Sequence, residues 1–382
     1  MHVTFILTSL YDPYAISRIE NIRRKGADTV VFGFKRKTSK GTPLHGNVTS
    51  LGYTEHGKYY KRIPAIIKSF FTVRKKVETT DVVYCTNLQT LLIGWLFCTS
   101  RKENIQLVYD VADVREVLIK KNFSSFFMRM FERFLINRTS IVVVTAPAYI
   151  DGYFKKIQRL LHTDYHIIEN KIDASSIIKT GETISLTNAE NSDTLTIGYF
   201  GVLRCKHSLE LLYDVVQAAE GRIRLYLRGF FIEHLELNEQ DILDSQYVTF
   251  GGSFVSPDDL QDIYSKIDLC WTAIYHAKSN VMWSRTNRFY QACYFRSPMI
   301  TQQGTPDASQ VEKHNIGFSI DLLNKRDALA KILSIKQKEI DTWKKNSLDL
   351  PEHIYVLTDE YDKLLEKLKA KQDRTFSTGI AH

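Results

Sequence analysis

The stretch from Thr194 to His207, Thr-Leu-Thr-Ile-Gly-Tyr-Phe-Gly-Val-Leu-Arg-Cys-Lys-His, combines a strand, a turn and the approach to a helix. Its first seven residues are rich in apolar and β-branched side chains, which predicts a buried strand ending at Phe200. Gly201 permits a tight turn, and the apolar spacing over 209–220 predicts a helix soon afterwards. A strand, a short turn and a helix in this order are the repeating unit of parallel sheets.

The same alternation continues on both sides of this stretch. Runs rich in valine and isoleucine predict further strands at 3–7, 29–34, 82–84, 106–109, 140–145, 223–227, 247–250, 268–273 and 299–301. Helix-like segments separate them, which indicates parallel strands buried on both faces. The sequence therefore predicts an α/β protein with two successive doubly wound, Rossmann-like sheets.

Length and composition divide the chain into domains. Its 382 residues exceed one ordinary core, and the polar, aperiodic segment 171–193 is typical of a linker. The first 190 residues hold 28 basic and 17 acidic side chains, a net charge of +11, whereas the rest carries −3. We expect an N-terminal domain over 1–170, a second domain over 194–345, a helix over 346–372 that packs back on the N-terminal domain, and a tail over 373–382.

Several classes of protein are disfavoured by what the sequence lacks. The five cysteines are an odd number without C-x-x-C spacing, so neither a disulfide framework nor a structural zinc site is expected. P-loop, G-x-G-x-x-G, G-x-S-x-G and Asp-x-Asp motifs do not occur, and we expect no metal and no resident cofactor. With neither a signal peptide nor a transmembrane segment, the expected location is cytoplasmic.

Two helix starts in the second domain suit an anion. Arg204 and Lys206 follow the turn at Gly201, where backbone N–H groups and two cations would hold a pyrophosphate. In the second cluster Arg288 lies in a first helical turn, preceded by possible N-caps at Ser284, Thr286 and Asn287. The alternatives are solvated cations in an ordinary turn and simple capping, but two such starts in one domain favour a nucleotide diphosphate.

An ordered series of motifs in the second half resembles the donor domain of GT-B glycosyltransferases, the large group related to glycosyltransferase family four. The turn at 198–207 resembles the family's G-x-L…K-G, and 287–299 resembles N-K-x-x-E-A-x-x-x-G-x-P-v. Further matches lie at 170–173, 227–229, 248–263, 267–270 and 317–318. The resemblance covers about 170–325 and implies two domains facing a central cleft.

What the resemblance implies is a nucleotide-sugar donor, with a UDP-sugar expected, held mainly by the second domain. Its donor-binding residues would be Gly201, Arg204, Lys206, Arg228, Gly252, Phe254, Ser284, Arg285, Thr286, Asn287, Arg288 and Gln291. Retaining members carry two glutamates eight positions apart, where this chain has Trp283 and Gln291. The departure favours an inverting, metal-independent subgroup similar to the xanthan-type glucuronosyltransferases, which take a base from the N-terminal domain; an inactive site is the alternative.

Carboxylates after the strand at 106–109 are the candidate bases. Asp113 is the first choice for taking the proton of the acceptor hydroxyl, with Asp110 as the alternative, because strand ends face the ligand crevice of such sheets. The competing interpretation is that one of them caps a helix beginning near 114. Tyr11, Asp12 and Tyr14 follow the first strand and are expected at the same edge, for acceptor contacts.

Two basic helices account for the charge of the N-terminal half. Segment 58–77 carries seven cations and no acid, which favours contact with an anionic membrane surface. Segment 120–138 has a full apolar stripe, which we interpret as facing the core beneath a solvated basic face.

Together these observations predict a glycosyltransferase that builds a bacterial surface polysaccharide on a glycan or polyprenyl-linked acceptor, peripheral on the inner face of the plasma membrane. Two alternatives stay open. One is a non-hydrolysing sugar-nucleotide epimerase, which needs no basic membrane face. The other is a non-catalytic anion- or nucleic-acid-binding protein, although no nucleic-acid module occurs and we expect no nucleic-acid partner.

Overall fold

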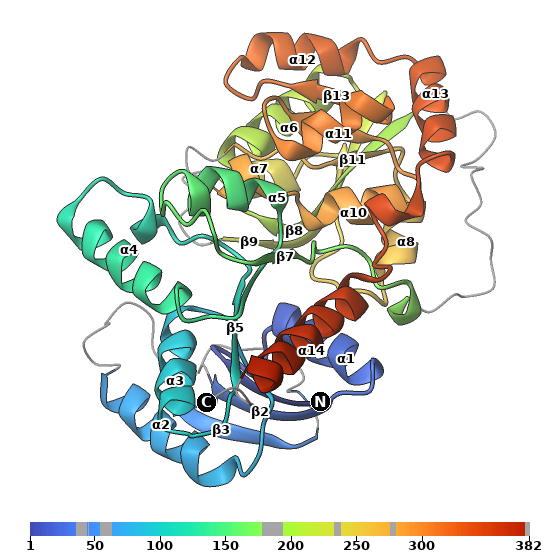
Figure 1. Ribbon diagram of the computed structural model, residues 1–382. Helices are drawn as coiled ribbons and strands as arrows, with labels where there is room; N and C mark the ends of the chain where they lie inside the picture. Colours follow the sequence, from blue (N-terminus) through green and yellow to red (C-terminus); the bar gives the residue numbers. More distant parts are fainter. Residues whose placement is uncertain are drawn as a thin grey trace. The chain divides into compact units, whose positions relative to one another are not determined.

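The computed structural model describes residues 1–35, 44, 46–53, 63–177, 194–232, 238–275 and 280–378 (Figure 1). The chain forms two compact units. Unit 1 comprises Met1–Glu169 and Asp359–His382, and unit 2 comprises Asn170–Thr358. Most of the predicted linker, 178–193, lies outside the described residues.

Unit 1 is built on a parallel sheet of seven strands in the order β3-β2-β1-β4-β5-β6-β7. The strands are β1 (His2–Leu7), β2 (Asp28–Lys35), β3 (Val48–Tyr53), β4 (Val82–Cys85), β5 (Gln106–Val111), β6 (Ile141–Val144) and β7 (Tyr165–Ile167). The helices are α1 (Pro13–Arg24), α2 (Ile63–Lys76), α3 (Leu88–Thr99), α4 (Phe123–Ile136), α5 (Pro147–Tyr149) and α14 (Glu360–Thr378). Short turns of helix occur at Glu116–Leu118 and Ile150–Lys155.

Unit 2 repeats the design with six parallel strands in the order β10-β9-β8-β11-β12-β13. They are β8 (Leu195–Leu203), β9 (Ile223–Phe231), β10 (Val248–Phe250), β11 (Leu269–Trp271), β12 (Met299–Gln302) and β13 (Gly317–Ile320). The helices are α6 (Lys206–Ala218), α7 (Glu239–Leu243), α8 (Leu260–Ser265), α9 (Asn280–Trp283), α10 (Asn287–Tyr294), α11 (Pro306–His314), α12 (Lys325–Leu333) and α13 (Gln337–Leu348), with 3-10 turns at Ala174–Ser176 and Glu352–Ile354.

The sheet of unit 2 is buried on both faces, as its unbroken apolar strands predict. Tyr199 packs into one buried cluster together with Leu212 of α6. Its neighbour Phe200 packs into a second cluster, with Phe289 of α10 and Ile263 of α8. Successive side chains of a strand point to opposite faces, so β8 supplies both halves of the core. The prediction of two doubly wound α/β sheets is confirmed.

The ends of β8 and β9 approach each other closely at two glycines. Gly201 and Gly229 are paired in register and have φ angles of +99° and +125°. A Cβ at Gly229 would lie 1.8 Å from the carbonyl oxygen of Gly201, so a side chain there is sterically excluded. Gly201 itself faces open space. The turn therefore needs glycine twice, once for contact and once for its φ.

The C-terminal helices differ from the prediction of one helix over 346–372. Helix α13 ends at Leu348 and α14 begins at Glu360, with Pro351 between them. Proline lacks the N–H that continues a helix, which explains the break. Helix α14 then runs to Thr378, through most of the predicted tail. It lies beside α1 in Figure 1, where Lys25 pairs with Asp362 at 2.6 Å.

Of the two basic helices of unit 1, one contradicts its prediction. Helix α2 begins at Ile63, and 58–62 lie outside the described residues. The apolar stripe of α4 does not face the core: Phe123, Phe126 and Phe127 are exposed, whereas Glu132 is buried. The interpretation of 120–138 as a core-facing helix with a solvated basic face was therefore wrong.

Candidate active site

In each unit, the strand order changes direction between two neighbouring strands. In unit 2, β8 lies between β9 and β11, so the connections from β8 and β11 leave in opposite directions. In unit 1 the corresponding neighbours are β1 and β4. Ligands of open α/β sheets bind beyond the carboxyl ends of the strands at such a point. The predicted donor residues of unit 2 and acceptor residues of unit 1 lie largely around these two places.

The turn from β8 to α6 is open to an anion. Helix α6 begins at Lys206 after the N-cap Cys205, and no side chain of the described residues caps its first turn. Arg204 is exposed, and the ammonium of Lys206 lies 3.9 Å from Glu210 in a loose pair on the same helix. Uncapped N–H groups at a helix start carry a partial positive charge. With Gly201 facing open space beside them, these N–H groups and the two cations have the chemistry that an anion requires.

The start of α10 is organised by a buried carboxylate. Thr286 is the N-cap and accepts a hydrogen bond from the N–H of Phe289. Its own N–H and hydroxyl donate to Asp307, the hydroxyl at 2.8 Å. Burial raises the pKa of Asp307 to about 7, against the hydrogen bonds from Thr286, which lower it. Of the three predicted caps, Thr286 holds that place, Asn287 is the first helical residue and Ser284 precedes it.

Arg288 joins the two helix starts. It is buried, and its Nη1 donates to the carbonyl oxygen of Phe200 at 2.8 Å. Its guanidinium lies 4.7 Å from the ring centre of Tyr199. The Nε has no hydrogen-bond partner within the described residues. Arg288 therefore brings the first turn of α10 to the end of β8, and its Nε is a donor that the described part of the chain leaves unpaired.

The loop after β10 is held by Arg228. Its Nε donates to the carbonyl oxygen of Gly252 at 3.1 Å, and its Nη2 donates to that of Ser253 at 3.0 Å. Gly252 has a φ of +68° and faces open space, while Phe254 is half-buried. These contacts give Arg228 a positioning role, because its guanidinium donates hydrogen bonds to the backbone of the loop.

Two further predicted donor residues lie on α10 or just before it. The side-chain carbonyl of Gln291 accepts a hydrogen bond from Tyr264 at 3.3 Å. Arg285 lies with its guanidinium 5.5 Å from the ring centre of Phe289 and is partly exposed. Gln291 thus keeps its amide group as a donor of hydrogen bonds, without a charge.

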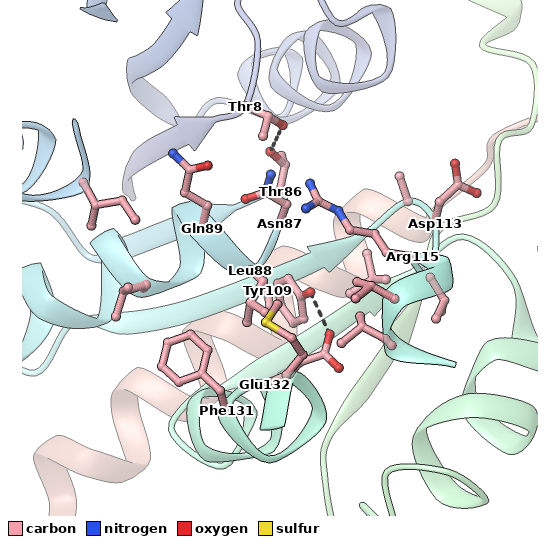
Figure 2. A pocket seen from close by; sticks show the side chains of 18 of the residues that line it. Thr8, Thr86, Asn87, Leu88, Gln89, Tyr109, Asp113, Arg115, Phe131 and Glu132 are labelled. Atoms are coloured by element: carbon pink, nitrogen blue, oxygen red, sulfur yellow. Dashed lines mark hydrogen bonds between the residues drawn. The ribbon is translucent and has the colours of Figure 1, made fainter. Parts of the chain in front are cut away.

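Unit 1 contains a cavity of about 470 Å³ at its own switch point. Thr8 follows β1 and Thr86 follows β4, and their hydroxyls lie 3.4 Å apart. Figure 2 shows these two residues, Asn87 and Gln89 on one side of the cavity, with Phe131 and Glu132 on the other. Its walls are therefore polar at the strand ends and largely apolar toward α4.

Asp113 and Asp12, predicted as base and acceptor contact, both line this cavity. Asp113 is exposed, and its Oδ1 accepts a hydrogen bond from Tyr149 at 3.3 Å. The chain after β5 forms a 3-10 turn at Glu116–Leu118 with Arg115 as its N-cap, so the helix expected near 114 does not form. Asp12 caps α1 by accepting from the N–H of Tyr14 at 3.2 Å.

The other predicted residues of unit 1 lie apart from the cavity lining. Asp110 is buried on β5 and accepts hydrogen bonds from the hydroxyls of Tyr14 and Tyr84. Tyr14 is thereby directed at Asp110. Tyr11 is partly exposed and does not line the cavity.

Sequence reasoning missed Asp307, Asn87 and Arg115. Asn87 had a local signal, a polar residue between the strand at 82–84 and an apolar helix, and it caps α3. Asp307 had none, because its partner Thr286 lies 21 positions away.

Comparisons with known proteins show which sequences and structures this chain resembles. The succinoglycan biosynthesis protein ExoL of Rhizobium meliloti (strain 1021) is 23% identical over 329 residues, covering 84% of this chain and 81% of that protein. Anabaena Alr3699/HepE, solved in complex with UDP and glucose, has a TM-score of 0.66 and 15% identity over 97% of this chain and 100% of that chain.

The lipopolysaccharide outer core galactosyltransferase WaaB, solved in its apo form, has a TM-score of 0.64 and 10% identity over 97% of this chain and 100% of that chain. No protein-family model matches the chain. Two parallel-sheet units, repeated in these neighbours over nearly the whole chain, confirm the predicted resemblance: this protein has the fold of the GT-B glycosyltransferases.

Proposed function

We propose that this protein is a glycosyltransferase that moves a sugar from a nucleotide donor to a hydroxyl of a glycan in bacterial surface polysaccharide synthesis. The observation that carries the proposal is the open β8–α6 turn, where an uncapped helix start, Gly201 and Arg288 meet at the switch point. The relation to a succinoglycan biosynthesis protein and the UDP and glucose held by HepE point to the same class of reaction.

The diphosphate of the donor would lie at this turn. The N–H groups of α6, Arg204 and Lys206 supply positive charge, and the buried guanidinium of Arg288, held on the carbonyl oxygen of Phe200, adds a fixed one. As the bond to the anomeric carbon breaks, negative charge grows on the leaving diphosphate, and preorganised donors of this kind stabilise it. The cations take the role that a metal ion fills in enzymes with an Asp-x-Asp motif.

The base of the donor would meet the loop that Arg228 holds, at Gly252 and Phe254. Thr286 and Asn287 at the start of α10 would approach the phosphates, and Gln291 a ribose hydroxyl. Ser284 and Arg285 would face the sugar. UDP is the nucleotide we propose, as in HepE.

Asp113 would act as the general base of an inverting transfer. It takes the proton of the acceptor hydroxyl while that oxygen bonds to the anomeric carbon and the nucleoside diphosphate leaves. Its exposure and its place on the cavity wall fit this role. Asp12 on the same wall would bind an acceptor hydroxyl.

Among the described residues, the helices are too short or too polar to cross a bilayer. We propose that the protein works as a peripheral protein on the inner face of the plasma membrane, where a lipid-linked acceptor is made. Helix α2 supports this, with Lys68, Arg74, Lys75 and Lys76 and no acid in its described length.

A nucleotide screen tests the proposal. The melting temperature is measured with UDP, GDP, CDP, ADP and TDP, each with and without magnesium. We expect UDP to raise it without metal, through preferential binding to the folded state, and expect Arg204→Ala with Lys206→Ala to remove the shift. Lys338→Ala with Lys345→Ala on α13 is the control of equal charge. The absence of any shift at millimolar nucleotide would overturn the donor site.

A further inference from the structure

Helix α4 presents its apolar face to solvent. Phe123, Phe126 and Phe127 are 85%, 55% and 57% exposed, and Met130 is exposed one turn further on. Helix α4 buries Ser125, Glu132, Leu135 and Ile136, so its apolar residues are fully buried only at its C-terminal end. A helix on the surface of a globular domain normally buries its apolar stripe, whereas α4 exposes most of its own.

The orientation is held by a polar network at Glu132. Its carboxylate accepts hydrogen bonds from the hydroxyl of Tyr109 at 3.0 Å, from the hydroxyl of Tyr153 and from the amide of Gln158. Burial raises the pKa of Glu132, while these donors lower it. Turning α4 over would leave the tyrosines and Gln158 without this acceptor, which is costly for buried polar groups. The outward aromatic face is therefore a stable feature of unit 1.

Helix α2 presents a similar surface. Ile63, Ile67 and Phe71 are exposed on it. Its described length has no acid, and the single acid of α4 is the buried Glu132. Lys120 and Lys121 stand exposed just before α4, and Arg138 just after it. Apolar side chains flanked by cations, with no exposed acid on the described length of either helix, match the interface of a bilayer that contains anionic lipids.

The same two helices also line the cavity of unit 1. Ile66 reaches it from α2, and Met128 and Phe131 reach it from α4. Phe131 is 36% exposed, so it belongs to both the cavity wall and the outer face. The polar wall with Asn87 and Arg115 lies away from Phe131 (Figure 2). An apolar path thus leads from the outer face of α4 toward a polar end.

We propose that the outward faces of α4 and α2 dock unit 1 on an anionic lipid bilayer, and that the cavity draws from it an acceptor with a hydrocarbon chain and a phosphorylated head. The chain lies along Met128 and Phe131, the phosphate of the head faces Arg115, and the hydroxyl that accepts the sugar faces Asp113. The acceptor part rests on the proposed sugar transfer, whereas the docking surface specifies the proposed membrane contact and does not depend on that reaction.

Cosedimentation of the full chain with vesicles tests the docking surface. Wild type is expected to bind phosphatidylcholine vesicles with 30% phosphatidylglycerol, and more weakly at high salt. Phe126→Ser with Phe127→Ser is expected to lower this affinity at least tenfold. Phe230→Ser is the matched control, because Phe230 is 55% exposed in unit 2. Melting temperatures and the UDP-induced shift should stay unchanged in all three proteins.

Substitutions at Met128 and Met130 distinguish the cavity from the outer face, because Met128 lines the cavity and Met130 does not. With farnesyl phosphate as the probe in calorimetry, Met128→Asp is expected to weaken binding at least tenfold and Met130→Asp less than twofold. Vesicle binding should respond in the opposite order. Met128→Ala gives the same ranking with a smaller change if Met128→Asp does not fold.

Several outcomes would overturn the inference. Equal vesicle binding by wild type and the double serine variant excludes α4 as the docking surface. A concentration-dependent dimer of wild type that the double variant loses identifies a second copy as the occupant instead. Farnesyl phosphate binding that ignores Met128 removes the cavity from the proposal. If UDP does not raise the melting temperature of wild type, only the donor site is refuted. Failure of the donor site and failure of the docking surface are therefore distinguishable.

Discussion

Arg18 on α1 and Asp110 on β5 form an ion pair of 3.3 Å between Nε and Oδ2, with both side chains buried. Tyr14 and Tyr84 donate to the two carboxylate oxygens at 2.5 and 2.6 Å. Arg18 also donates to the hydroxyl of Tyr361 on α14 at 3.0 Å. The pair therefore links the first helix, a central strand and the last helix of unit 1. It engages both oxygens of Asp110 in the fold.

Loss of this pair should destabilise the protein far more than loss of the half-exposed pair between Lys25, at the end of α1, and Asp362 on α14. Arg18→Met leaves Asp110 buried without its cation, which typically costs about 3–5 kcal/mol. Lys25→Met removes the half-exposed pair with Asp362, worth about 1 kcal/mol or less. Urea unfolding of the two variants measures both values. Similar losses would mean that the buried pair is not what ties α1 to its neighbours.

Asp113→Asn should abolish most of the sugar transfer while leaving the donor bound. An amide cannot accept the proton of the acceptor hydroxyl, and general bases typically contribute about 10²- to 10⁴-fold to the rate. Release of UDP in the presence of acceptor measures the rate, and the UDP-induced thermal shift measures donor binding. Glu116→Gln, an exposed acid nearby, is the control. Retention of more than a tenth of the activity would assign the base elsewhere.

Gly229→Ala should disrupt the end of β8, because its Cβ would meet the carbonyl of Gly201 at 1.8 Å. The unfavourable φ alone costs about 1–3 kcal/mol, and displacement of the Gly201 turn should weaken UDP binding. Gly304→Ala is the control: its φ is +74°, but its Cβ would face open space. Chemical unfolding and the UDP-induced shift are compared. If Gly304→Ala is equally damaging, backbone strain and not the close contact decides.

Asp307 should make stability fall as the pH rises. Its pKa is raised from 3.8 to about 7 in the folded state, so between these values the folded protein binds a proton that the unfolded chain has released. Its stabilising contribution is present below pH 4 and is lost progressively up to pH 7. Asp307→Asn keeps the acceptor for Thr286 without titrating.

The measurement is the unfolding free energy of wild type minus that of Asp307→Asn from pH 4 to 8. We expect the difference to decrease to about pH 7 and then level off. A flat difference over this range would show that the Asp307 carboxyl titrates at its ordinary value.

Local patterns were sufficient for most of the sheet framework and for parts of the candidate site. The strand ending near Phe200, the turn at Gly201 and a capped helix start before Asn287 all depend on residues that are neighbours in sequence. Such features follow from side-chain periodicity, glycine and capping chemistry, which can be recognised in the sequence without knowing the fold. The prediction of one helix over 346–372 was wrong because charged periodicity does not show where a helix is interrupted, and Pro351 lies between α13 and α14.

The orientation of α4 needed the tertiary structure. Its periodicity showed that the helix has an apolar face, but not which neighbour that face meets. The decision came from Tyr109 and Gln158, which lie 23 and 26 positions from Glu132 and satisfy its buried carboxylate. In the same way Arg18 donates a hydrogen bond to the hydroxyl of Tyr361, which lies 343 positions away. Amphipathic spacing is a property of a segment, whereas burial of a charged group depends on partners that folding alone brings together.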